Sequence, residues 1–227
     1  MSLHPKKKSD MGKDWMQRRL DRSKKIHPEY HLIVTEGTKT EPEYFNAIKE
    51  LINQNYRDRI QLEICGRGEN TVTLFESAKR IAEIDPNGYK HVWVVYDKDD
   101  FPAEHFNLTV ELCSAYSSRN RTYHAIWSNQ CIELWFLLHF DYLQSDISRT
   151  EYFPKLSQKL KRLGKGDYKK NRADMFSILR PYIDTAIKNA KKLYDEKSAC
   201  TPTDAAPCTT AFQLLEVLLP YINEEGT

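Results

Sequence analysis

Short apolar segments alternate with amphipathic ones through the first half of the chain, and this alternation limits the possible folds most strongly. The pattern predicts strands at 31–35, 60–65, 91–96 and 122–127, and helices at 41–52, 71–84 and 106–117. Strands that alternate with helices favour right-handed crossovers and a mainly parallel sheet flanked by helices, an α/β fold. Because the segment 91–96 is the most apolar, we expect it to be a central strand, buried on both faces.

Strand-like segments stop after residue 128, and in the remainder of the chain the spacing of apolar residues predicts helices. The segment 131–140 is hydrophobic all round, which predicts a buried helix. Further helices are expected at 154–161, 174–194 and 210–221, with a loop at 198–207. We therefore divide the chain into a basic N-terminal arm expected to be mobile (1–29), an α/β core (30–145) and a helical C-terminal region that packs on it (146–227).

Charge is unevenly distributed along a chain whose formal net charge is only +2 over 227 residues. Lysine and arginine gather in the first 25 residues and again between 159 and 172. These segments are either solvated surface or two arms that neutralise nucleic-acid phosphates. No apolar run is long enough to span a membrane, and the five scattered cysteines lack metal-binding spacing. We expect a cytoplasmic protein with reduced thiols.

Carboxylates follow two of the predicted strands directly. Glu36 comes after the first strand, and Asp97, Asp99 and Asp100 come after the third. The carboxyl ends of parallel strands meet at one edge of a sheet, and hard oxygen ligands are what Mg²⁺ prefers. If the two strands are neighbours, these side chains converge on one or two ions that can act on a phosphodiester. The alternative is that they cap helices or sit in turns.

Three segments together resemble the RloB family, which is found among bacterial phage-defence and restriction-associated genes. They are residues 36–45 (EGTKTEPEYF), 97–101 (DKDDF) and 128–140 (SNQCIELWFLLHF). RloB-like proteins resemble Toprim domains, the metal-dependent fold of topoisomerases, primases and some nucleases. The resemblance implies a Toprim-like sheet, with Glu36, Asp97 and Asp99 as metal ligands. It also implies a separate ATPase subunit, encoded alongside, as a partner.

Several other acidic and histidine side chains are candidates with more than one interpretation. Glu41 fits the first turn of a helix, where its charge is favourable, or a direct catalytic role. Glu133 lies in an apolar helix, so it needs a partner: either it faces the metal site or it pairs with a basic residue. His139 fits a core histidine better than a general base.

Basic side chains near these segments are candidate nucleic-acid contacts. Lys39 and Lys98 flank the expected ligands, where they contact a phosphate or reduce repulsion between carboxylates. Arg67 fits a phosphate contact at a helix N-terminus or a plain surface turn. Within the second basic segment, the candidates for backbone contact are Tyr168, Lys169 and Lys170. The tyrosine would stack on a base.

These features lead to one main hypothesis and two alternatives. The main hypothesis is a Toprim-type nuclease, the effector of an antiphage system, that cleaves DNA or RNA such as tRNA. Mg²⁺ or Mn²⁺ would bind Glu36, Asp97 and Asp99 with Asp100 as an auxiliary ligand, and water would be the nucleophile, since no Ser, Cys or Tyr stands in a triad. The alternatives are a non-catalytic binding module with a structural ion and a primase-like nucleotidyltransferase. A homo-oligomer is compatible with each.

Overall fold

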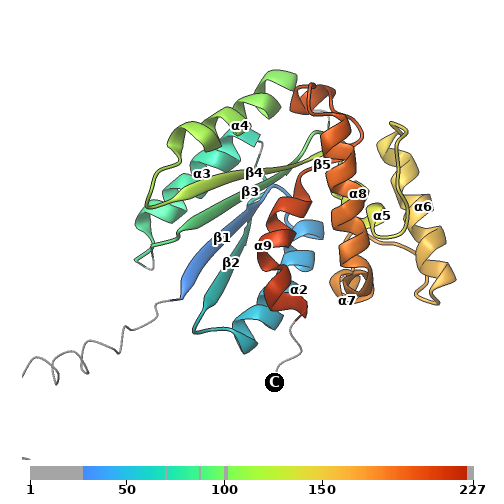
Figure 1. Cartoon of the computed structure of the whole chain (residues 1–227), viewed down its shortest axis with the longest axis horizontal. Coiled ribbons are helices and arrows are strands. Elements are labelled where there is room, and N and C mark those ends of the chain that lie inside the picture. Colours follow the sequence, from blue (N-terminus) through green and yellow to red (C-terminus); the bar gives the residue numbers. More distant parts are fainter. Residues whose placement is uncertain (1–27, 70, 87, 100–101, 224–227) are drawn as a thin grey trace, which may run out of the picture.

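A computed structural model describes residues 28–69, 71–86, 88–99 and 102–223, which form one sheet with helices on both faces (Figure 1). The strands are β1 (Glu29–Thr35), β2 (Ile60–Gly66), β3 (His91–Asp97), β4 (Thr122–Asn129) and β5 (Cys208–Thr209). The helices are α2 (Thr40–Asn55), α3 (Thr71–Ile84), α4 (Ala103–Tyr116), α5 (Glu133–Leu138), α6 (Arg149–Arg162), α7 (Met175–Leu179), α8 (Ile183–Glu196) and α9 (Ala211–Asn223). Two short 3₁₀ helices are η2 (Arg180–Tyr182) and η3 (Pro202–Asp204).

The strand order is β2-β1-β3-β4-β5, with the first four strands parallel. This confirms the predicted mainly parallel α/β sheet. β3 lies between β1 and β4, and all of its residues from Val92 to Asp97 are buried. As expected, this strand is apolar along its length because helices cover both of its faces.

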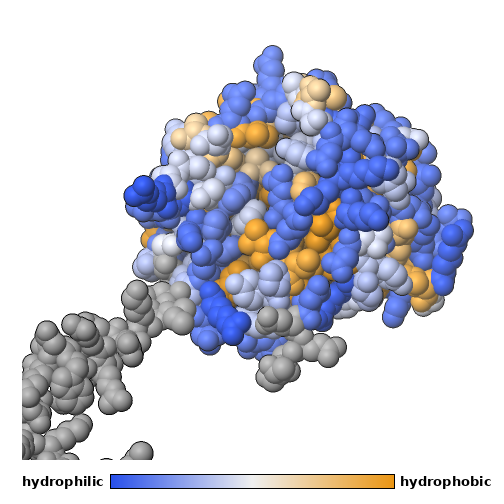
Figure 2. Space-filling model, viewed as in Figure 1, coloured by the Kyte–Doolittle hydropathy of each residue, from blue (hydrophilic) through white to orange (hydrophobic). Residues whose placement is uncertain are grey.

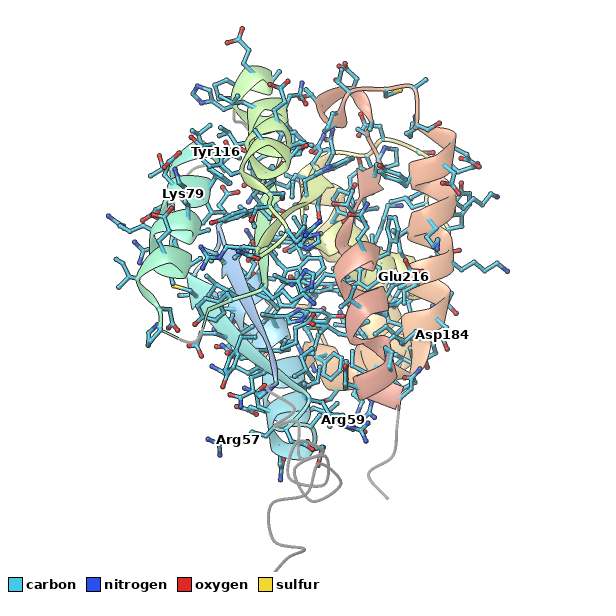
Figure 3. All side chains as sticks on the ribbon, turned by 60° about the vertical axis from the view of Figure 1, so that its left-hand side comes forward. Arg57, Arg59, Lys79, Tyr116, Asp184 and Glu216 are labelled. Atoms are coloured by element: carbon cyan, nitrogen blue, oxygen red, sulfur yellow. The ribbon has the colours of Figure 1, made fainter. Side chains whose placement is uncertain are left out.

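Alternate residues of the strands face two separate apolar clusters. Ile33, Trp93 and Ile126 face the larger cluster, which α2 and the helices after β4 cover. Leu32 and Val94 face the smaller one, under α3 and α4. On that second side, the Lys79 ammonium lies 4.0 Å from the centroid of the Tyr116 ring and ties α3 to α4 (Figure 3).

The helical second half of the chain packs on the sheet through α5. All six residues of this helix are buried, which confirms the predicted buried helix, although it is shorter than the expected 131–140. It contacts α6 and α8, and the larger apolar cluster contains residues from Ile33 to Ile222. Hydrophobic side chains reach parts of a surface that is otherwise mostly hydrophilic (Figure 2). On α9, Val217 is 42% exposed.

Two predictions about the second half were wrong. Cys208 and Thr209 form β5 antiparallel to the end of β4, whereas no strand was expected after residue 128. Two residues are too few to show a strand period, so the pairing leaves no pattern in the sequence. The single helix expected at 174–194 is divided into α7, η2 and α8. Pro181 lies at the break, and it has no N–H to continue the helical hydrogen bonds.

The expected N-terminal arm lies outside the described residues up to position 27, and Glu29, assigned to that arm, already belongs to β1. All five cysteines have free thiols. Within the described ranges, no helix is both long enough and apolar enough to cross a membrane.

Candidate functional site

The carboxyl ends of β1 and β3 lie side by side and bring Glu36 to Asp97. The backbone N–H of Glu36 donates to the carbonyl oxygen of Val95 at 2.9 Å. The N–H of Asp97 donates in turn to Oε2 of Glu36 at 3.0 Å. The two strands are neighbours, as the sequence hypothesis required, so the two acidic segments emerge from one edge of the sheet.

Asp97 is buried, with 8% of its surface exposed, and its two carboxylate oxygens differ. Oδ2 accepts a hydrogen bond from the N–H of Ile132 at 3.1 Å, immediately before α5. Oδ1 is buried and has no hydrogen-bond partner within the described part of the chain. One oxygen therefore ties the end of β3 to the residue that precedes α5, and the other has no partner among the described residues.

Glu41 and Glu133 add two buried carboxylates beside this pair. Glu41 lies against Gly37, and its carboxylate accepts backbone hydrogen bonds from Gly37 and from Glu41 itself. Glu133, only 2% exposed, accepts a hydrogen bond from the hydroxyl of Tyr168 at 2.9 Å. Of the two alternatives for Glu133, the structure thus favours the one in which it faces the acidic site.

These side chains line a cleft of about 530 Å³. Six carboxylates contribute to its walls: Glu36, Glu41, Glu69, Asp97, Asp99 and Glu133. The basic side chains that line it are Lys39, Arg149 and Lys170. Arg149 forms an ion pair with Asp99, with 2.8 Å between Nη1 and Oδ1. Acidic groups therefore outnumber basic ones in this cleft, and a cation would relieve the repulsion between the groups that are ionised.

Burial raises the pKa of three carboxyl groups in the cleft. It raises the pKa of Glu36 from 4.5 to about 7, with Asp99 and Glu41 adding repulsion. The pKa of Asp97 is raised well above its usual value by burial and then by the charges of Glu41 and Glu133. Burial and Glu133 also raise the pKa of Glu41. In each of the three groups the cleft therefore favours the protonated form more than water does, and a bound cation would act in the opposite direction.

The other predicted site residues occupy different positions relative to the cleft. Lys39 and Lys170 line it, whereas Lys98 and Lys169 are not among its lining residues. Arg67 forms an ion pair with Glu69, a lining residue, at 2.9 Å. Asp100 lies outside the described residues.

Two aromatic candidates belong to the core. Tyr168 is 7% exposed, and its ring packs between Phe136 and Phe153. The ring is therefore not accessible to stack on a base, contrary to the prediction, because Phe136 and Phe153 cover it. Its hydroxyl holds Glu133. His139 is a buried core histidine, as expected, with Nδ1 2.9 Å from the carbonyl oxygen of Trp135.

Comparison with known families decides the affiliation of the chain. A family profile described as RloB-like protein matches residues 31–218. The chain belongs to the RloB-like family. No match to a curated protein or to a solved structure reaches significance. The family match runs from β1 into α9, so the acidic cleft of this RloB-like protein lies wholly within it.

Two charged residues that line the RloB-like cleft escaped the sequence analysis. Glu69 follows β2, and its position after a strand was an available signal. Arg149 begins α6, fifty-two residues after Asp97, and nothing local in the sequence indicates that it reaches Asp99. Its position depends on how α6 packs against α5.

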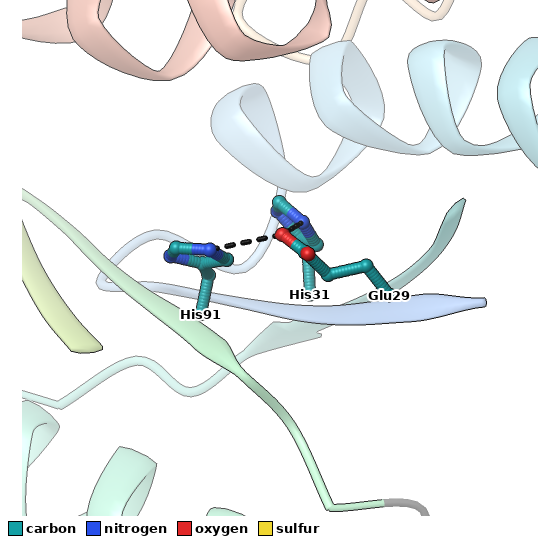
Figure 4. A group of neighbouring side chains, drawn as sticks. All are labelled: Glu29, His31 and His91. Carbon is teal, nitrogen blue, oxygen red and sulfur yellow. Dashed lines mark hydrogen bonds and ion pairs between the residues drawn. The ribbon is translucent and has the colours of Figure 1, made fainter. Parts of the chain in front are cut away.

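A second group that can hold a metal ion lies at the opposite ends of β1 and β3 (Figure 4). Glu29, His31 and His91 each offer one ligand atom, all within 4.8 Å of one another. Burial lowers the pKa of His31 to about 4 and also lowers that of His91, so both imidazoles are neutral near pH 7. The sequence hints at this group only through the two-residue spacing of Glu29 and His31.

Proposed function

We propose that this RloB-like protein is a metal-dependent nuclease of the Toprim type that cleaves phosphodiesters of DNA or RNA. Glu36, Asp97 and Asp99 would hold Mg²⁺ or Mn²⁺, with Asp100 as an auxiliary ligand. The observation that carries the proposal is a pair of carboxylates, the partly buried Glu36 and the buried Asp97, joined at adjacent strand ends on the wall of a cleft.

The chemistry of the cleft fits a hard divalent cation. Its negatively charged donors are carboxylate oxygens, which Mg²⁺ and Mn²⁺ prefer. Oδ1 of Asp97 is buried without a hydrogen-bond partner among the described residues, as expected for an atom meant for a cation. When bound, such an ion supplies Lewis-acid stabilisation of the charge that develops on a phosphodiester.

The chain itself supplies orientation and positive charge. The Asp97 N–H fixes the carboxylate of Glu36, and the Tyr168 hydroxyl fixes that of Glu133. Glu41 and Glu133, which the proposal does not assign to the ion, are available to accept a proton from an attacking water. Lys39 and Lys170 lie exposed on the cleft, where their ammonium groups can bind phosphate oxygens.

The biological setting belongs to the same proposal and rests on the RloB resemblance. It is that of an effector in bacterial antiphage defence, restrained or delivered by a separate ATPase subunit. Co-expression with the ATPase encoded beside it, followed by purification through a tag on either protein, tests this partnership directly.

The nuclease proposal is tested by incubating the full chain with plasmid DNA and, separately, with bulk tRNA in Mg²⁺ or Mn²⁺. Changes in the surroundings of a metal site already cost about 10–100-fold in affinity or activity. We therefore expect Glu36→Gln and Asp97→Asn each to lower the cleavage rate by more than about 100-fold. Isothermal titration with Mn²⁺ should show the same two variants losing binding.

Matched controls are Glu83→Gln and Asp195→Asn, which replace exposed carboxylates at the ends of α3 and α8. Both should cleave at the wild-type rate. Nucleic-acid binding that survives in Asp97→Asn, with no cleavage by the wild type alone or with its ATPase, would instead support a binding module. Template-dependent incorporation of labelled nucleotides would support a primase-like transferase.

A further inference from the structure

A triad of potential metal ligands lies at the amino ends of β1 and β3, away from the acidic cleft (Figure 4). Glu29 and His31 are two residues apart on β1 and so point to the same face of the sheet. His91 is the register partner of His31 on β3. His31 and Glu36, which directly follows β1, are five residues apart, which is about 17 Å along a strand. This triad and the cleft therefore cannot share an ion.

The separations of the ligand atoms match the size of a metal site. Oε1 of Glu29 lies 3.2 Å from Nε2 of His31 and 2.9 Å from Nε2 of His91. Ligands of a tetrahedral zinc ion at its usual bond lengths of about 2.0–2.1 Å are separated by about 3.4 Å. Small side-chain movements, without any change in the strands, would therefore admit an ion.

The chemistry of the donors selects the class of metal. Two imidazole nitrogens and one carboxylate oxygen form a ligand set typical of zinc, whereas magnesium prefers oxygen donors alone. We infer that Glu29, His31 and His91 form a second metal centre, which binds Zn²⁺ and cross-links β1 to β3. The side chains of Glu29 and His91 are 37% and 22% exposed, so solvent can reach the site and occupy a fourth position.

The surrounding contacts orient Glu29 and His91. Oε2 of Glu29 is held by the ammonium of Lys90 at 2.8 Å, which leaves Oε1 to face the histidines. Nδ1 of His91 lies 2.9 Å from Nε2 of His124. Without a metal, Nε2 of His91 donates to Oε1 of Glu29 at 2.9 Å. When a metal takes Nε2, the proton must be on Nδ1, and donation from this Nδ1–H to His124 would hold that tautomer.

Metal binding by His31, the third ligand, requires its ring proton to move from one nitrogen to the other. This change of tautomer gives the inference a spectroscopic signature. The indole N–H of Trp93 donates to Nδ1 of His31 at 3.2 Å, so the proton of the neutral ring is on Nε2. Zinc at Nε2 requires that proton to be on Nδ1 instead. The hydrogen bond from Trp93 must then break, and metal binding should change the indole absorption and fluorescence of this residue.

The test uses the full chain, stripped with EDTA, desalted and titrated with Zn²⁺ in excess Mg²⁺, which occupies hard oxygen sites. We expect one equivalent of zinc to bind and to raise the midpoint of thermal unfolding. Glu29→Gln and His91→Gln should each weaken binding by at least about tenfold, since changes outside the ligands already cost that much. With Co²⁺ as a probe, the wild type should give the visible absorption of a tetrahedral nitrogen and oxygen site.

His105→Gln is the matched control, because this histidine is exposed on α4, and it should bind zinc as the wild type does. Circular dichroism on each variant separates lost binding from lost folding, and the isosteric Glu29→Gln change is at a partly exposed residue. Absence of zinc binding by the folded wild type would overturn the inference. So would stoichiometric binding that persists in both ligand variants, or binding that disappears in Asp97→Asn, which would place the zinc in the cleft.

Discussion

Asp97 is buried and Glu36 is partly buried, and both have close negative neighbours, a costly arrangement unless a proton or a cation compensates it. Their carboxylates are fixed by backbone N–H groups, so they cannot turn away from each other. A chain that needed only stability would place neutral side chains here. The free-energy cost of placing these carboxylates together is understandable if they bind an ion.

Glu36 should give the metal-free protein a measurable pH dependence. Burial raises its pKa from 4.5 to about 7, so the folded state holds more protons than the unfolded state between these values. The free energy of unfolding therefore falls as pH rises from about 4.5 to about 7, by about 3 kcal/mol for the full shift. Urea denaturation in EDTA at pH 5 and pH 8 measures this. Glu36→Gln should lose less stability than the wild type, and Glu83→Gln should lose the same amount; equal losses in all three would contradict the prediction.

At the scale of residues, the sequence was sufficient to predict site residues that directly follow an apolar strand. It was not sufficient to predict site residues that reach the cleft through the packing of distant elements. Glu36 and Asp97 are of the first kind, since strand ends meet in any parallel sheet. Arg149 reaches the cleft only because α6 packs on α5, and Tyr168 is buried only because Phe136 and Phe153 enclose its ring. Such contacts join distant parts of the chain and leave no local pattern.

At the scale of elements, the turn from β1 to α2 packs against the carboxylate of Glu41. Gly37 lies so close to it that a Cβ atom at position 37 would overlap the carboxylate. Gly37→Ala should therefore lower the free energy of unfolding by about 1–3 kcal/mol, the usual cost of overpacking. The same substitution made on Glu41→Ala should cost less, because the obstructing group is gone. Equal costs in the two backgrounds, measured by urea denaturation, would show that this contact does not shape the turn.

The elements themselves were predictable to the extent that they carry a period. The four parallel strands and α3 follow from apolar runs and helical spacing, because burial of one or both faces imposes those patterns. β5 could not be predicted, since its two residues pair with β4 through backbone contacts and through Thr209, whose Oγ1 lies 3.0 Å from Oγ of Ser128. Pro181 was a signal for the division of α7 from α8. The sequence prediction instead followed the helical period, which continues across this proline.

At the scale of the whole molecule, the larger apolar cluster joins the sheet to the C-terminal helices. It includes Trp93 on β3, Trp135 on α5 and Leu214 on α9, on both sides of the boundary expected at residue 145. Residues that share one close-packed core lose their packing together. The cleft between them should therefore be as stable as the fold itself.

Leu214→Ala tests this coupling, because the side chain is fully buried on α9, far along the chain from the four parallel strands. We expect a loss of about 2–5 kcal/mol in the free energy of unfolding, the usual cost of such a cavity. Far-UV circular dichroism and tryptophan fluorescence should report one coincident urea transition, shifted equally in both signals. Val217→Ala, at a position on the same helix that is 42% exposed, should change stability by less than about 0.5 kcal/mol. Two separate transitions, with only one of them moved by Leu214→Ala, would mean that the helical region folds apart from the sheet and that the cleft can open without global unfolding.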